Sequence, residues 1–107
     1  MPIIRIQYDN NKFGKEKLDG LVIAIQKIVS EETKIKEVFV YVNSAEITYL
    51  ADPVEVFIEM SANKIENLET LFEGIKTKVI NWKKENNFDL PINLTLIPMN
   101  WKLAIGI

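Results

Sequence analysis

The sequence predicts an α+β domain of two layers, in which a four-stranded mixed sheet carries two helices on one face. Four short stretches alternate apolar and polar residues, which is typical of strands, and two long stretches space apolar residues by three and four, which is typical of amphipathic helices. The order strand–helix–strand occurs twice, with corresponding elements about fifty residues apart. We therefore expect residues 1–107 to form one domain built from two tandem βαβ units.

The first unit begins with the alternating residues 3–8, which we predict to be a strand. The turn-forming sequence DNNKFG follows it. Residues 15–30 then have the spacing of a helix with one apolar side, formed by Leu18, Leu21, Val22, Ile25, Ile28 and Val29. The sequence KEVFVYV (36–42) supplies the second strand.

The second unit repeats this plan. PVEVFIEM (53–60) and LPINLTLI (90–97) are the predicted strands. Asn63 and Glu66 have the spacing of a capping box that would begin the intervening helix, and Lys83 and Lys84 suit its negative C-terminal end. The apolar side of this helix is formed by Leu68, Leu71, Phe72, Ile75, Val79 and Trp82.

Both helices should cover the same face of the sheet, because βαβ crossovers are right-handed. The opposite face then mixes aromatic and aliphatic side chains with charged ones, a composition typical of interfaces. On that face we expect Arg5 to bond to Glu55 or Glu59, since an isolated charge is costly to desolvate. The covered face should carry Ile4, Ile6, Val38, Val40, Val54, Val56, Ile58, Leu94 and Leu96.

The last seven residues, WKLAIGI (101–107), alternate apolar side chains with almost no polar ones to offset them. An apolar strand left open at a chain terminus is an aggregation hazard. The segment therefore either completes its own sheet or adds to a neighbouring subunit, and we favour the second interpretation.

The composition excludes several classes of function. The chain has no cysteine and no histidine, which removes the usual zinc ligands, thiol nucleophiles, disulfides and histidine bases. A net charge of −2 gives no basic face for nucleic acid. No apolar run approaches the roughly 20 residues of a membrane span, and no signal peptide is visible. We expect a cytoplasmic protein with no cofactor, no metal site and no membrane partner.

The assembled elements resemble the tautomerase superfamily, which includes macrophage migration inhibitory factor (MIF) and the oxalocrotonate tautomerases. The resemblance lies in the initial MP, the tandem βαβ units of this length and the apolar C-terminal strand. DPVEVF (52–57) is similar to the third strand of an uncharacterised bacterial branch, a domain-of-unknown-function family. The similarity covers nearly the whole chain, so residues 1–107 would be a single tautomerase/MIF-like domain.

This resemblance implies a homotrimer in which three sheets line a central barrel and the helices lie outside. It also implies that Pro2, once Met1 is removed, acts as general base in the keto–enol isomerisation of a small carbonyl or carboxylate substrate. Relatives bind the acidic substrate with a positive side chain shortly after the first helix, where Lys34 and Lys36 both lie, and Lys34 is the candidate. Arg5 and Asn93 are the other candidate substrate-binding residues.

Two alternatives stay open at the level of sequence. Proline also suits the first residue of a strand, where no ladder donor is required, so Pro2 has a purely structural interpretation. The same order of elements describes the ferredoxin-like fold, so the alternative function is a non-enzymatic interaction or binding module. The two folds differ in whether another strand intervenes within each parallel pair.

Overall fold

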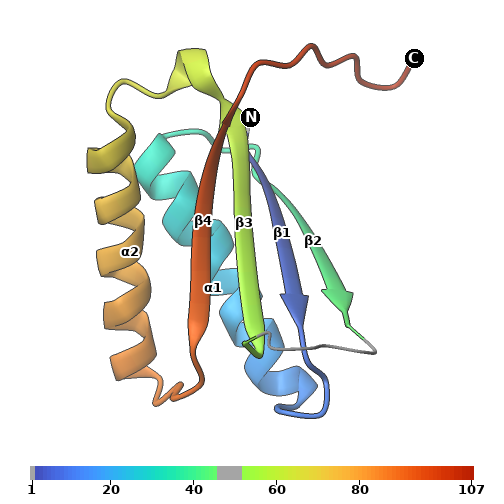
Figure 1. Cartoon of the computed structure of the whole chain (residues 1–107), viewed down its shortest axis with the longest axis vertical. Coiled ribbons are helices and arrows are strands. Elements are labelled where there is room, and N and C mark those ends of the chain that lie inside the picture. The colour runs from blue at the N-terminus through green and yellow to red at the C-terminus, as the bar shows by residue number, and fades with distance from the viewer. Residues whose placement is uncertain (1, 46–51) are drawn as a thin grey trace.

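The computed structural model describes residues 2–45 and 52–107 of the chain. The first βαβ unit consists of β1 (Ile3–Tyr8), α1 (Lys15–Thr33) and β2 (Phe39–Ser44). The second consists of β3 (Val54–Ser61), the short 3-10 helix η1 (Ala62–Lys64), α2 (Leu68–Glu85) and β4 (Ile92–Met99). The elements occur in the predicted order, and Figure 1 shows the four strands as one sheet with the helices packed against it.

The strands lie in the order β2-β1-β3-β4. β1 is parallel to β2, β3 is parallel to β4, and the two units meet where β1 and β3 pair antiparallel. Each unit thus pairs its own two strands directly, with no strand between them. In the ferredoxin-like fold another strand splits each βαβ unit. The ferredoxin-like alternative is therefore wrong, and the predicted mixed sheet is confirmed.

The core lies between the sheet and the two helices. The side chains predicted for the covered face are either fully buried or packed against the buried cluster, as are Leu18, Leu21, Ile25 and Val29 of α1. From α2, Ile75 and Val79 are buried. Side chains of the opposite strand parity, such as Arg5, stay at least partly exposed. The predicted division of the sheet into a covered and an open face is confirmed.

An aromatic cluster closes the end of the core where β1 and α2 finish. Phe13 lies 5.6 Å from Tyr8 and 5.9 Å from Phe88 between ring centroids, and Phe88 lies 5.5 Å from Trp82. Phe13 and Phe88 are buried although both belong to loops. The helical and strand periodicities of the sequence did not assign either residue to the core.

The start of α2 differs from the prediction. Residues 62–64 form η1, and the helix begins only at Leu68, with Asn67 as its N-cap. The Asn67 side chain accepts a hydrogen bond of 3.0 Å from the N–H of Thr70. The capping box of Asn63 and Glu66 is therefore wrong, because the chain uses these residues to turn from β3 into the helix. The two lysines predicted for the last turn of α2 do lie there.

Two helix-interior glycines lie in different surroundings and give a matched pair of stability predictions. Gly20→Ala should raise the free energy of unfolding by about 0.5–1 kcal/mol, because alanine favours the helix. An added Cβ there would lie 4.0 Å from Trp82, an ordinary contact. At Gly74 the added Cβ would overlap the carboxylate of Glu32, which bonds to Lys78 at 3.1 Å. In Gly74→Ala, displacing the Glu32 carboxylate should therefore cancel most of the increase in the free energy of unfolding that alanine would otherwise bring.

The measurement is urea unfolding of the single variants and of Gly74→Ala combined with Glu32→Ala, all at one protein concentration. With the Glu32 carboxylate removed, Gly74→Ala should stabilise the chain about as much as Gly20→Ala does. Equal gains from Gly74→Ala with and without Glu32 would contradict this account.

The C-terminal segment forms no strand and pairs with none of the described residues. In Figure 1 it leaves the end of β4 and runs out beyond the sheet. The interpretation that it completes the sheet of its own chain is therefore wrong.

No helix in the described ranges combines the length and the apolar character needed to cross a bilayer.

Candidate functional site

Pro2 stands immediately before β1 and is fully buried. Its carbonyl accepts a hydrogen bond of 3.1 Å from the N–H of Phe39, which fixes the start of β1 beside the start of β2. Ile3 pairs with Glu59 in the antiparallel register, so one further step places Pro2 opposite Met60. Pro2 is thus held at the end of the sheet where β1 and β2 begin and β3 finishes.

A hollow of about 350 Å³ opens at this same end of the sheet. It lies between the C-terminal end of α1 and the N-terminal end of α2, and Met60 is one of its lining residues. Two lysines from different elements also line it, Lys34 after α1 and Lys64 at the end of η1. The structure therefore brings Lys34 to the end of the sheet that holds Pro2.

The backbone at Lys34 adopts the left-handed conformation, with φ 59° and ψ 28°, and caps the C-terminus of α1. Side-chain hydrogen bonds hold this turn. The hydroxyl of Ser30 donates to the carbonyl of Ile35 at 2.8 Å, and the hydroxyl of Thr33 donates to the carbonyl of Val29 at 2.7 Å. The position of Lys34 is thus set by the way α1 ends.

The other two candidates lie on the open face of the sheet. Arg5 Nε is 2.7 Å from Glu59 Oε1, which confirms the expected ion pair, and its guanidinium lies 5.6 Å from the ring centroid of Tyr41. Asn93 donates a hydrogen bond of 3.1 Å to Glu55 Oε1. Within one chain, the structure brings neither Arg5 nor Asn93 to Pro2.

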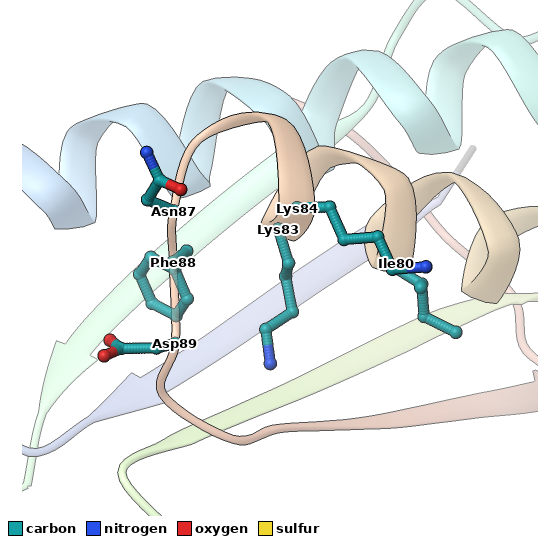
Figure 2. Close-up of a pocket in the computed structure, with 6 residues that line it drawn as sticks. All are labelled: Ile80, Lys83, Lys84, Asn87, Phe88 and Asp89. Carbon is teal, nitrogen blue, oxygen red and sulfur yellow. The ribbon is translucent and has the colours of Figure 1, made fainter.

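A larger hollow, of about 500 Å³, lies at the opposite end of α2. Figure 2 shows the side chains of Lys83 and Lys84 pointing in different directions from it, so their charges do not converge on one ligand position. Asn93 lines a third hollow of about 610 Å³ beside β4, together with Thr95 and Lys76. Pro2 is not among the lining residues of these two hollows or of the hollow that Lys34 lines.

The described residues offer few other catalytic groups. None of their polar or charged side chains is buried, and no cluster of three or more acidic side chains among them is placed to hold a metal ion. Lys64 and Met60 were not singled out by the sequence. Lys64 lies in a connection whose path depends on η1, and Met60 follows the ordinary alternation of a buried strand.

No protein-family model and no curated protein matches the chain in sequence. Solved structures do match it in fold. A macrophage migration inhibitory factor-like protein from Entamoeba histolytica is 16% identical with a TM-score of 0.63, over 96% of this chain and 95% of that one. A domain of unknown function (DUF1904) from Sebaldella termitidis is 13% identical with a TM-score of 0.60, over 100% and 98% of the two chains.

A fused 4-OT asymmetric trimer is 9% identical with a TM-score of 0.68, over 97% of this chain and 92% of that one. Identities this low establish the fold and not the reaction. The chain has the tautomerase/MIF-like fold of two helices on a four-stranded mixed sheet, as the sequence resemblance predicted. The similarity extends to a bacterial protein of the domain-of-unknown-function type.

Proposed function

We propose that this chain is a cytoplasmic, homotrimeric tautomerase that interconverts the keto and enol forms of a small carbonyl acid, with the amine of Pro2 as general base. The observation that carries the proposal is the placement of Pro2, fully buried at the sheet end where Lys34 lines a hollow. The tautomerase/MIF-like fold supports it. The absence of cysteine fits a reducing compartment.

The chemistry requires Pro2 to be the first residue of the mature chain. Met1, whose removal this demands, lies outside the described residues. A free α-amine has a pKa of about 7.7–8.0, and burial lowers that pKa by disfavouring the ammonium form. Such an amine takes a proton from the carbon next to a carbonyl and returns it at another position, which is keto–enol isomerisation.

Lys34 would bind the carboxylate of the substrate. Glu32, which lines the same hollow, is bonded to Lys78, whereas no carboxylate of the described residues pairs with Lys34. Arg5 and Asn93 lie on the open face, which in a trimer of this fold faces the other copies. These two residues would therefore reach the substrate only across a subunit boundary.

The trimer in this proposal is supported by two observations. The fused 4-OT protein with the same fold was solved as a trimer. The open face of the sheet also has the composition of an interface, since Phe57 lies between Glu55 and Glu59 along β3 and all three side chains are only partly exposed.

The test is ketonisation of phenylenolpyruvate by protein that begins at Pro2. Lys34→Met should lower kcat/KM by roughly 10- to 100-fold, mainly through KM, because a charged hydrogen bond to the carboxylate is lost. Lys36→Met is the matched control, since Lys36 is exposed and does not line the hollow. Equal losses of kcat/KM in the two variants would show that Lys34 does not bind the substrate. If the protein that begins at Pro2 shows no activity above the buffer rate, the proposed reaction is wrong for this substrate class.

A further inference from the structure

Both helices are followed by a residue in the left-handed conformation, but the two turns are held differently. After α2 this residue is Asn87, with φ 52°, and the N–H of Phe88 donates to the carbonyl of Lys83 at 3.0 Å. This is the backbone bond of the Schellman motif, in which glycine or asparagine is the usual left-handed residue. The turn after α2 thus follows the common pattern.

After α1 the left-handed residue is Lys34, with φ 59°, and side chains hold the turn. The N–H of Ile35 donates to the hydroxyl of Thr33 at 3.3 Å, and the carbonyl of Ile35 accepts from the hydroxyl of Ser30 at 2.8 Å. The Thr33 hydroxyl itself donates to the carbonyl of Val29 at 2.7 Å. Both backbone groups of the residue after Lys34 are therefore bonded to hydroxyls of α1.

A lysine in this conformation is unfavourable, because its Cβ crowds the backbone and glycine would fit without that penalty. Residues held in such conformations are concentrated at functional sites. Lys34 is also one of two lysines that line the hollow at the Pro2 end of the sheet. A requirement for the ammonium group at this position accounts for a lysine where glycine would fit better.

The connection from α1 to β2 is tied to α1 a second time, just before β2 begins. The side-chain amide of Gln26 donates to the carbonyl of Val38 at 3.0 Å. The next residue, Phe39, donates its N–H to the carbonyl of Pro2 at 3.1 Å. The placement of Lys34 relative to Pro2 therefore depends on a short connection whose two ends are bonded to side chains of α1.

We infer that Ser30 is a positioning residue: its hydroxyl, together with that of Thr33, holds the turn that presents the ammonium group of Lys34 to the substrate carboxylate. Ser30 does not line the hollow, so it acts through the turn and not by touching the substrate. The inference rests on the role of Lys34 in the proposed function, but not on the proton transfer proposed for Pro2. Loss of the Ser30 hydroxyl should weaken carboxylate binding and leave proton transfer unchanged.

The test is an NMR titration of the chain that begins at Pro2 with 3-phenylpropanoate, a carboxylate that carries no ketone. Ser30→Ala should raise the dissociation constant about 5- to 10-fold, because the carbonyl of Ile35 loses its donor and the turn is no longer fixed. Alanine favours a helix more than serine does, so α1 itself is not weakened. Ser30→Thr keeps a hydroxyl and should bind within about twofold of the wild type. Thr77→Ala, which removes an exposed hydroxyl from α2, is the matched control.

A double-mutant comparison distinguishes positioning from a general effect on the fold. In the Lys34→Met background, Ser30→Ala should change the dissociation constant by less than about twofold, because no ammonium group is left to position. With phenylenolpyruvate as substrate, Ser30→Ala should raise KM about 5- to 10-fold and change kcat by less than about twofold.

The possible outcomes separate this inference from the proposed reaction. Ser30→Ala that binds 3-phenylpropanoate like the wild type, or loses as much affinity in the Lys34→Met background, would overturn the inference alone. Lys34→Met that binds like the wild type would overturn both the inference and the role of Lys34. If binding weakens as expected but no variant ketonises phenylenolpyruvate, the inference is supported and the proposed reaction is wrong.

Discussion

Any residue retained or added ahead of Pro2 should lower kcat/KM for phenylenolpyruvate ketonisation by about 100- to 10,000-fold relative to the chain that begins at Pro2. The physical reason is that acylation turns the amine into an amide, whose nitrogen is not a base. Pro2 is also fully buried beside Phe39 and opposite Met60, so an extension would compete with the substrate for this end of the sheet.

Intact-mass analysis of untagged protein establishes which form is present before the rates are compared. Pro2→Ala, processed so that the substituted residue is the first of the chain, is the control, because it keeps a terminal amine but makes it primary. Its rate should fall between those of the processed wild type and the extended chain. Equal activity with and without the extension would show that the amine of Pro2 is not the general base. It would not affect the assignment of the fold.

Phe88→Ala should lower the free energy of unfolding by about 3–5 kcal/mol, the cost of removing a buried aromatic ring. Phe88 is 5% exposed and contacts both Phe13 and Trp82, so its loss opens a cavity beside these two rings. It also follows the left-handed residue Asn87, and its N–H donates to the carbonyl of Lys83 at 3.0 Å, so the ring is fixed by the end of α2.

The control for this prediction is Ile23→Ala, which truncates a side chain that is 66% exposed on α1. That change should alter the free energy of unfolding by no more than about 0.5 kcal/mol. Both are measured by urea unfolding at one protein concentration, since assembly makes apparent stability depend on concentration. A loss of less than about 1 kcal/mol for Phe88→Ala would show that the aromatic cluster is not part of the cooperative core.

Periodicity predicted most of this fold because it reports burial directly. Ile4, Ile6 and Ile58 alternate with polar residues in strands that have one covered and one open face, and the structure buries all three. The same parity placed Arg5 on the open face and gave Glu55 or Glu59 as its expected partner, and the structure shows that Arg5 pairs with Glu59. The burial of Phe13 and Phe88 was not predicted from the sequence. Both lie in loops, where no regular spacing marks buried residues and burial depends on the path of the chain.

The candidate site was less predictable than the fold. Lys34 lies at the same end of the sheet as Pro2 because α1 returns the chain across the sheet, and the βαβ pattern of the sequence indicates this return without giving the distance between the two residues. Lys64 joins the same hollow through η1, a turn whose position depends on where α2 begins. The helix is capped by the Asn67 side chain, whereas the sequence analysis had placed the cap at Asn63.

The place of β2 at the edge of the sheet has a consequence for timing during protein synthesis. Residues 39–44 leave the ribosome well before residues 101–107, by several seconds at roughly 5–20 residues per second. A nascent chain thus carries an edge strand with exposed apolar side chains before the C-terminal segment has been made. An unpaired edge strand with apolar side chains is a template for pairing with other chains, so edge-to-edge aggregation is most favourable during this interval of synthesis.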